Sequence, residues 1–156
     1  MDYLEIEMAK IAADLVIRNM TVHDYEAVVS LWQLAGLPYR PEGRDQLHNV
    51  ARELSQDTAI FLIGELKNDI VSAVFGTHDG RKGWINRLVV HPDFQCKGIG
   101  YSLVQAVEQR LSDHGIDIVA CLIEDWNPQS MAFFKKIGYC PHDDIVYFSH
   151  RKHPQV

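Results

Sequence analysis

An apolar strand that passes through a short turn into two glycines and a helix constrains this chain more than any other feature. The strand ends with Leu-Val-Val at 88–90, the turn covers 91–97, and the helix opens at Gly98 and Gly100. The first four N–H groups of a helix lack internal acceptors and lie at the positive end of the helix dipole. Glycine removes the Cβ that would keep an anion away from them. The segment therefore predicts a phosphate-binding site.

Two common nucleotide-binding motifs are excluded for this segment. No Gly-Lys-Ser/Thr follows the turn, so it is not a Walker loop, and the third glycine of the dinucleotide fingerprint is missing. On the glycines alone, a second interpretation stays open, in which Gly98 and Gly100 are turn residues with no ligand.

The surrounding hydrophobic pattern predicts a single α/β (α+β-like) domain with a mixed central sheet. Alternation and short turns predict an antiparallel first half, whereas a strand–helix–strand unit after residue 84 predicts a parallel pair with a right-handed crossover. Residues 1–14 are interpreted as an N-terminal lead, 15–150 as the domain and 151–156 as a tail. Strands are expected at 15–18, 59–65, 70–77, 84–90, 117–123 and 145–149, and helices at 21–36, 45–55, 99–115 and 127–138.

Composition narrows the function classes. The chain has 156 residues, a net charge of −6 and no sustained Lys/Arg cluster, which argues against nucleic-acid binding and weakly favours a cationic partner. No apolar run approaches the ~20 residues that cross a bilayer. The acidic N-terminus lacks the positive region of a signal peptide, so we expect a cytoplasmic protein without a membrane partner. Neither the three cysteines nor the eight histidines have convincing metal-site spacing, so no metal is expected.

Two motifs in register identify a family resemblance. Gln95-x-x-Gly98-x-Gly100, after Leu-Val-Val-His-Pro, resembles the pyrophosphate-binding motif Gln/Arg-x-x-Gly-x-Gly/Ala of the GNAT acetyltransferases. Downstream, the segment from Asn127 through Ser130 to Gly138-Tyr139 resembles the same family's Asn-x-x-Ala/Ser…Gly-Phe/Tyr segment. The order of predicted elements across about residues 15–150 also agrees with that family.

The resemblance implies a GNAT fold with six to seven strands and a bound acetyl-CoA co-substrate. It implies that the backbone of the strand pairs with the pantetheine arm, that the loop and helix start hold the pyrophosphate, and that the start of the last helix contacts the cofactor near its sulfur. The residues that would carry these contacts are Leu88, Val89, Val90, Gln95, Cys96, Lys97, Gly98, Ile99, Gly100, Tyr101, Asn127 and Phe134. Asn127 is also interpretable as an ordinary helix cap, and this interpretation is compatible with the cofactor contact.

The chain departs from the family at the expected acid and base. Phe134 stands where many members carry a tyrosine that protonates the leaving thiolate, and Tyr101, Tyr139 and Tyr147 are candidate replacements. Because thiols have a pKa of roughly 8.5, the acid is dispensable. Trp84 and Asn86 occupy the usual base positions. We therefore consider Asn86, through a bound water, and Glu124 or its neighbour Asp125 as catalytic candidates.

The predicted function is transfer of an acetyl group from acetyl-CoA to a primary amine by direct attack in a ternary complex. The acceptor is a small-molecule amine or a peptide amine. Tyr39, as an apolar or cation–π wall, and Arg40, as a carboxylate clamp, are its candidate contacts in the 36–43 loop. Two alternatives remain: a non-catalytic acyl-CoA-binding sensor and a peptide N-terminal acetyltransferase. Because dimers are frequent among similar proteins, a homodimer is considered as well.

Overall fold

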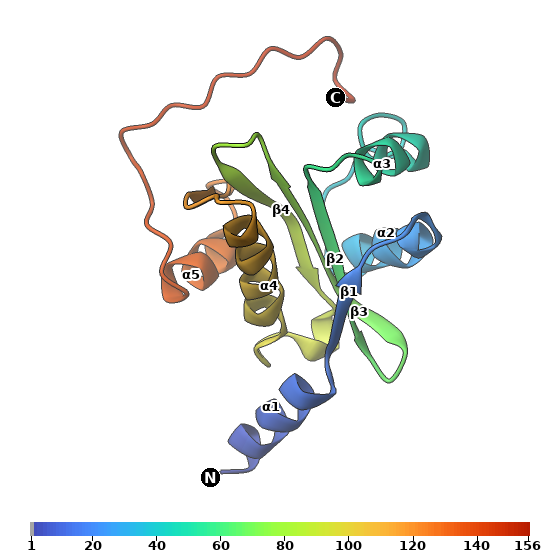
Figure 1. The fold of residues 1–156 in the computed structure, drawn as a ribbon, viewed down its shortest axis with the longest axis vertical. Coiled ribbons are helices and arrows are strands. Elements are labelled where there is room, and N and C mark those ends of the chain that lie inside the picture. Colours follow the sequence, from blue (N-terminus) through green and yellow to red (C-terminus); the bar gives the residue numbers. More distant parts are fainter. Residues whose placement is uncertain (1) are drawn as a thin grey trace.

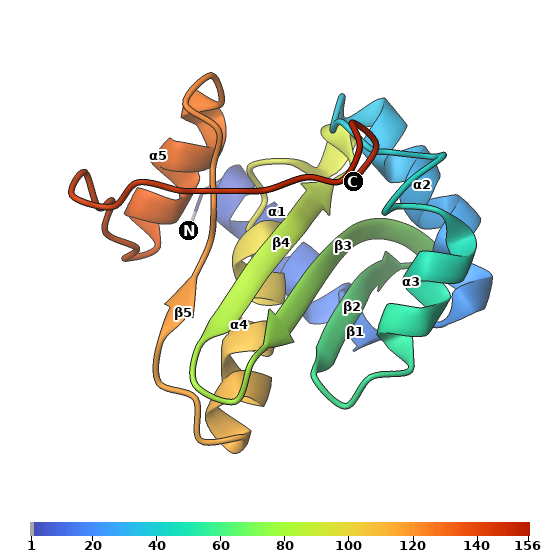
Figure 2. The same cartoon turned by 90° about the horizontal axis from the view of Figure 1, so that it is seen from above.

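The computed structural model describes residues 2–156. The chain folds into one mixed sheet with helices on both faces (Figures 1 and 2). The sheet has five strands in the order β1-β2-β3-β4-β5; the first four are antiparallel and β5 runs parallel to β4. The strands are β1 (Val16–Asn19), β2 (Ala59–Leu66), β3 (Asp69–His78), β4 (Gly83–Val90) and β5 (Val119–Ala120). The helices are α1 (Tyr3–Asp14), α2 (Tyr25–Leu34), α3 (Leu47–Leu54), α4 (Ile99–Asp113) and α5 (Pro128–Lys136), with 3-10 turns at Val22–Asp24 and Pro92–Phe94.

The antiparallel half is built from hairpins whose turns are encoded locally. Lys67 and Asn68 both have positive φ, 51° and 69°, which is the pattern of the two-residue type I′ turn that suits the twist of paired strands. Between β3 and β4, the Asp79 carboxylate accepts hydrogen bonds from the N–H groups of Arg81 and Lys82. These turns fix the register of the three strands that carry the site.

Each face of the sheet buries its own apolar cluster. One cluster packs α4 and the buried Phe134 of α5 against the sheet, and Leu103, Val107 and Leu111 of α4 are fully buried there. The other packs α2 and α3 over β2 and β3 around Trp32, which is 0% exposed. A chain of this length can support both clusters in one domain without disulfides.

The strand count corrects the expectation from sequence. The described chain has five strands instead of six to seven, because residues 145–149 form no strand. The segment that follows α5 arches away from the sheet (Figure 1). The expected strand at 117–123 is reduced to the two residues of β5. Strand structure needs a hydrogen-bonded neighbour, and the apolar pattern alone does not say whether one is present.

The N-terminal residues also differ from expectation. Instead of an undefined lead, residues 3–14 form α1, which begins with a capping box between Asp2 and Glu5 and contacts α4. At the second helix, the expected start near Thr21 is a 3-10 turn, and the α-helix begins at Tyr25. The Asp24 carboxylate accepts from the Thr21 N–H, and Arg18 bridges Asp24 to Glu65 on β2.

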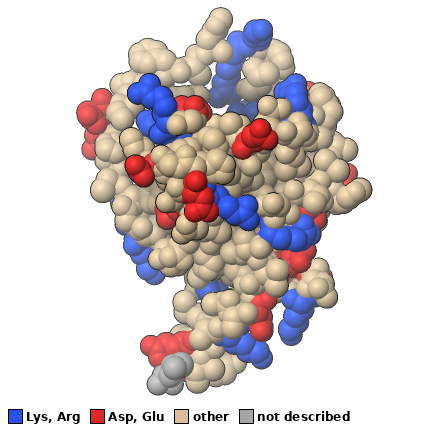
Figure 3. All heavy atoms as spheres, viewed as in Figure 1, with Lys and Arg blue, Asp and Glu red and all other residues tan. Residues whose placement is uncertain are grey.

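No helix within residues 2–156 combines the length and apolar character that a bilayer span demands. In the same residues, no three His, Cys, Asp or Glu side chains are grouped so that they could hold a metal ion. On the face shown in Figure 3, Lys and Arg alternate with Asp and Glu instead of forming one basic patch.

Candidate active site

The predicted phosphate-binding loop connects β4 to α4. After the 3-10 turn, Cys96 has φ 60° and Gly98 has φ 85°, so the chain bends twice before α4 begins at Ile99. The Gln95 amide donates to the Val90 carbonyl oxygen at 3.1 Å, which ties the loop back to the end of β4. A Cβ at Gly98 would meet nothing within 4 Å, so its left-handed backbone, not crowding, explains the glycine.

The loop presents a run of backbone donors. Across the described chain, no backbone or side-chain acceptor is recorded for the N–H groups from Cys96 to Tyr101. These six consecutive donors surround the N-terminus of a fifteen-residue helix, where the dipole is positive. Adjacent phosphates need several donors at this spacing, so the residues present fit a pyrophosphate.

Strand β4 ends with an irregular, partly unpaired backbone. Phe75 pairs with Asn86 and Ala73 pairs with Val89, so Arg87 and Leu88 lie opposite Val74 alone. This is a β-bulge, and Arg87 has φ 52°. On the other side, β4 pairs with β5 only at Gly83 and Trp84, and Figure 2 shows β4 and the segment after β5 separating beyond that point. The β4 edge from Asn86 to Val90 therefore has no strand partner on the β5 side among the described residues.

Helix α5 closes the other side of the loop. Asn127 caps it by accepting from the Ser130 N–H at 3.1 Å, with Pro128 at the first helical position, as the sequence predicts. A Cβ on Gly100 would lie 3.4 Å from the Phe133 ring, so α4 and α5 approach closely there. Phe134, in contrast, is only 7% exposed and packs edge-on against Tyr139 in the core. Its ring has little free surface for the cofactor contact expected of it.

The catalytic candidates lie on β4 and in the segment that follows the neighbouring strand β5. Asn86 is exposed on β4, one residue before the bulge, whereas Glu124 and Asp125 are exposed beyond β5. Of the three tyrosines, Tyr139 is half-buried and donates to Glu108, and burial raises its pKa above the ordinary value. Tyr101 is on the first turn of α4, beside the loop, and accepts from Gln105. Tyr147 lies on the C-terminal segment that stands away from the body.

The 36–43 loop is held by a residue that the sequence reasoning missed. Arg87 donates to the Pro38 carbonyl oxygen at 2.8 Å, and its guanidinium lies 4.0 Å from the Trp32 ring centroid. Its Nη2 atom is 3.7 Å from the Asp45 carboxylate, which also accepts from the Arg40 N–H. Burial lowers the pKa of Arg87. The signal available in the sequence was an arginine inside an apolar strand.

The two residues of the 36–43 loop that were predicted to contact the acceptor, Tyr39 and Arg40, differ in their burial. Tyr39 is half-buried, lies 6.1 Å from Trp32 between ring centroids, and accepts a hydrogen bond from Gln33. The Arg40 side chain is exposed, and within residues 2–156 its guanidinium has no hydrogen-bond or ion-pair partner. The Arg40 guanidinium is therefore available to an acceptor substrate, but in the described residues it makes no contact with the β4 bulge.

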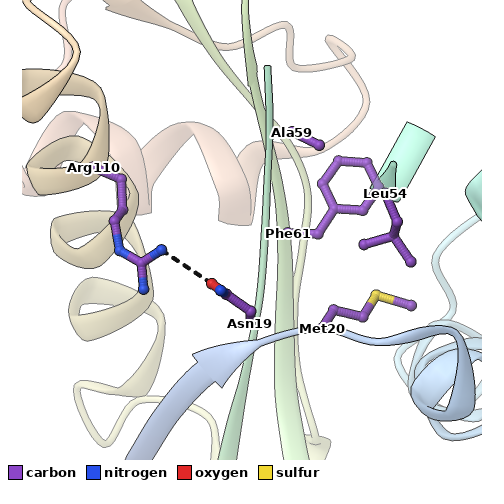
Figure 4. A pocket seen from close by; sticks show the side chains of 6 residues that line it. All are labelled: Asn19, Met20, Leu54, Ala59, Phe61 and Arg110. Carbon is purple, nitrogen blue, oxygen red and sulfur yellow. Dashed lines mark hydrogen bonds between the residues drawn. The ribbon is translucent and has the colours of Figure 1, made fainter. Parts of the chain in front are cut away.

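A further pocket lies outside this arrangement. A cavity of about 190 Å³ opens at the β1 edge of the sheet, where Arg110 of α4 donates to the Asn19 amide oxygen at 3.0 Å (Figure 4). The residues that line it are Asn19, Met20, Leu54, Ala59, Phe61 and Arg110. None of them belongs to the 95–100 loop or the β4 bulge, so we do not assign the transfer chemistry to it.

Comparison with known proteins identifies the family of the chain. Residues 25–139 match the model of the acetyltransferase (GNAT) family. Over 123 residues, the chain is 32% identical to the acetyltransferase ECA0875 of Pectobacterium atrosepticum, covering 79% of this chain and 86% of that protein.

Solved structures share the fold at low identity. An aminoglycoside acetyltransferase, meta-AAC0020, from an uncultured soil metagenomic sample, solved with sisomicin, has a TM-score of 0.75 at 18% identity, covering 92% of this chain and 99% of that one. The PaiA N-acetyltransferase of Thermoplasma acidophilum, solved with coenzyme A, has a TM-score of 0.74 at 18% identity, covering 84% and 92%. With the family match, the helix-start donors and the bulged β4, these findings establish that the chain is an acetyltransferase and belongs to the GNAT family.

Proposed function

We propose that this acetyltransferase moves an acetyl group from acetyl-CoA to a primary amine by direct attack, with both substrates bound at once. The observation that carries the proposal is the run of six N–H groups from Cys96 to Tyr101 that have no acceptor in the described chain, directly after the free edge of β4. Acetyl-CoA combines a pyrophosphate with an extended amide-bearing arm. The run of N–H groups matches the pyrophosphate, and the free edge of β4 matches the arm.

The backbone of β4 orients the thioester. Residues 88–90 would pair with the amides of the pantetheine arm as an added strand would, because their outer edge lacks a partner. The bulge at Arg87 and Leu88 turns backbone groups out of the ladder. An N–H directed at the thioester carbonyl stabilises the negative charge that develops on its oxygen during attack. Holding both reactants at one strand end supplies much of the remaining rate.

Proton transfer needs little from side chains. The amine loses a proton as it attacks, and Asn86, which is exposed on β4, would hold a water that carries this proton away; Glu124 is the second candidate. The departing thiolate is stable enough near neutral pH to leave without an acid, since thiols have a pKa of roughly 8.5. Phe134 in place of a tyrosine is therefore compatible with turnover.

The acceptor is proposed to be a cation in solution, of either small-molecule or peptide origin. A net charge of −6 favours encounter with positively charged molecules, and only the free amine reacts once it is bound. Aminoglycosides, which meta-AAC0020 acetylates by its name, are one such class. Tyr39 would line this site and Arg40 would bind a carboxylate if the acceptor has one. We expect the reaction to take place in the cytoplasm.

A thiol-release screen with acetyl-CoA tests the proposal. The amines are polyamines, aminoglycosides, amino acids and short peptides, and the readout is CoA thiol formed per enzyme. Release that depends on one amine class supports the function, and mass spectrometry of the product identifies an acetylated amine. Tight acetyl-CoA binding with no release for any class would identify a sensor instead, and release with peptides alone would identify a peptide N-terminal acetyltransferase.

Arg40→Ala then refines the acceptor. If Arg40 binds a carboxylate, KM rises for carboxylate-bearing amines and acetyl-CoA affinity is unchanged. Arg52→Ala is the matched control, since Arg52 is an exposed arginine on α3. Unchanged kinetics for Arg40→Ala with carboxylate-bearing amines would leave amines without a carboxylate as the acceptor class.

A further inference from the structure

Arg87 has a backbone conformation that is unusual for a strand residue. Its φ of 52° lies in the left-handed region, which a residue with a side chain keeps only where its surroundings impose it. Among the described residues, the other non-glycine residues with positive φ lie in the β2–β3 turn and in the 91–97 loop, outside any strand. Arg87 is also one of the two residues that form the β4 bulge. The contacts of Arg87 therefore determine whether the bulge keeps its shape.

The Arg87 side chain is held by residues from outside its own sheet. Its Nη1 donates to the Pro38 carbonyl oxygen at 2.8 Å, and its guanidinium carbon lies 4.0 Å from the centroid of the Trp32 ring. Its Nη2 is 3.7 Å from the Asp45 carboxylate. Trp32 belongs to α2, whereas Pro38 and Asp45 belong to the segment between α2 and α3. Because the side chain is only 15% exposed, these contacts restrict the guanidinium and the backbone that carries it.

The segment that holds the guanidinium is itself fixed by hydrogen bonds. The Asp45 carboxylate accepts from the Arg40 N–H at 2.6 Å, and the Asp45 carbonyl oxygen accepts from the Tyr25 hydroxyl at 2.8 Å. The Asn49 side-chain amide donates to the Gly43 carbonyl oxygen at 2.7 Å. These bonds connect the segment to α2 and α3, so it is a firm support for Arg87.

Two donors of Arg87 are buried without an acceptor. Within the described chain, neither its Nε nor its Nη2 has a hydrogen-bond partner, and the Nε1 of Trp32 has none either. A buried donor without an acceptor costs free energy, as does a left-handed backbone in a residue with a side chain. Such local costs concentrate at functional sites, where the position of a group matters more than the stability it adds. Both costs fall on the residue directly before Leu88, at the end of β4 that we assign to the thioester.

We propose that Arg87 is a positioning residue for the transfer reaction. Through its contacts with Pro38, Trp32 and Asp45, its guanidinium holds the bulge in the conformation that directs a backbone N–H at the thioester carbonyl. The same contacts place the 36–43 loop beside the end of β4, so one side chain sets how the acceptor amine meets the thioester. The pyrophosphate contacts at residues 96–101 do not depend on it. This inference rests on the proposed function.

Arg87→Leu removes the guanidinium and is the first test. We expect kcat to fall at least about tenfold and KM for the amine to rise, while the Kd of acetyl-CoA stays within about twofold. Arg18→Leu is the matched control, because Arg18 also pairs with two carboxylates, those of Asp24 and Glu65, but near the β1 edge of the sheet. Arg18→Leu should lose stability and keep kcat per binding-competent molecule, which the stoichiometry of titration calorimetry counts.

Infrared spectroscopy of bound acetyl-CoA separates positioning from stability. With a carbon-13 label in the acetyl carbonyl, the C=O stretch should lie at lower frequency on the parent chain than in solution, because a hydrogen bond polarises the carbonyl. Arg87→Leu should return the stretch toward its solution frequency, whereas Arg18→Leu should keep the frequency of the parent chain. A loss of stability alone does not move this frequency in the molecules that remain folded.

Asp45→Asn is a milder variant that tests the same contact if Arg87→Leu does not fold. It keeps an acceptor for the Arg40 N–H and removes only the charge beside Nη2 of Arg87, so kcat and the carbonyl frequency should change in the same directions by less. In the double variant, the effects of Asp45→Asn and Arg87→Leu should not add, because both act on one contact.

The results that would overturn the inference are specific. Parent-like kcat and carbonyl frequency in folded Arg87→Leu, or in Asp45→Asn where only that variant folds, would remove Arg87 from positioning. Equal losses of kcat in Arg87→Leu and Arg18→Leu would reduce its role to stability. A parent chain that acetylates no amine would instead contradict the proposed function, and the carbonyl frequency would still decide whether Arg87 positions the thioester.

Discussion

The ammonium group of Lys97 lies 2.8 Å from the Glu7 carboxylate of α1, so the phosphate-binding loop is tied to the N-terminal helix by an ion pair. Both side chains are about one-third exposed. Lys97 lies within the run of six N–H groups from Cys96 to Tyr101, and a bound pyrophosphate would compete with Glu7 for its charge.

Removing the Glu7 charge should therefore tighten cofactor binding. Glu7→Gln frees Lys97 and removes a negative charge beside the anion site, and we expect an increase in acetyl-CoA affinity of about two- to fivefold, which is the range for partly exposed pairs. Asp14→Asn removes an equal charge at the far end of α1 and serves as the control. Titration calorimetry at low and high salt measures both. Equal affinities for Glu7→Gln and the parent chain would exclude Lys97 from the phosphate site.

Arg87 should stabilise the 36–43 loop. Replacement by leucine removes the nearer and more buried of the two cations beside the buried Asp45 carboxylate, together with the contact with Trp32, and we expect a loss of about 2–3 kcal/mol in the free energy of unfolding. Arg44→Leu is the control, because Arg44 is half-exposed and its nitrogen is 4.0 Å from Asp45. Urea denaturation gives both values. If the loop covers the acceptor, KM for the amine also rises while acetyl-CoA affinity does not; similar stability for both variants would remove Arg87 from this role.

Asp24 should make stability depend on acid pH. The hydrogen bonds from Arg18 lower the pKa of Asp24 to about 2, against an ordinary value of about 3.9 in the unfolded chain. Its contribution is present above the unfolded value and is lost as the pH falls from about 4 toward 2. Allowing for the partial exposure of Arg18, we expect this contribution to be on the order of 1–2 kcal/mol.

The comparison of Asp24→Asn with the parent chain measures that contribution. The difference in unfolding free energy should be largest near neutral pH and should shrink below about pH 4, because protonated aspartate resembles asparagine. Asp57→Asn, at an exposed carboxylate, is the control for the loss of one negative charge. A difference that is constant with pH would contradict the assignment.

The three cysteines should differ in reactivity. Burial raises the pKa of Cys121 to about 11, so its thiol is mostly protonated at pH 8 and should alkylate slowly. Cys96 and Cys140 are exposed and should react first. Because Cys96 lies in the phosphate-binding loop, acetyl-CoA should protect it and leave Cys140 unprotected, as peptide mass spectrometry can follow. If acetyl-CoA protected Cys96 and Cys140 equally from alkylation, or protected neither, the cofactor would not bind at the 95–100 loop.

Locally encoded features were predictable from the sequence, and features that depend on distant partners were not. The start of α4 at Gly98 and the Asn127-Pro128 cap follow from residues adjacent in the chain, and the structure has both. Helix α1 also has a local signal, the capping box Asp2-x-x-Glu5 with which it begins. The burial of Phe134 depends on which face of α5 meets Tyr139, and spacing from a motif does not determine that face.

The remaining differences between the predicted and the observed structure depend on contacts between residues that are distant in the sequence. The apolar pattern at 117–123 and 145–149 fits a strand in each case, but a strand forms only where a neighbour offers hydrogen bonds. The role of Arg87 likewise depends on the bulge in β4, which brings its side chain to Trp32 and Pro38 from a position far along the chain. The predicted roles of the individual site residues remain predictions.

The most direct test of the account is acetyl-CoA affinity at Gly100, measured by calorimetry on a matched pair of variants. Gly100→Ala adds a Cβ at ordinary contact distance from Phe133 and keeps all the backbone donors, so affinity should stay close to that of the parent chain. Gly100→Glu adds a negative charge on the first turn of α4, within the run of six N–H groups, so affinity should fall at least about tenfold, or ~1.4 kcal/mol, in a protein that circular dichroism shows to be folded. Unchanged affinity in a folded Gly100→Glu variant would contradict the placement of the pyrophosphate at the start of α4.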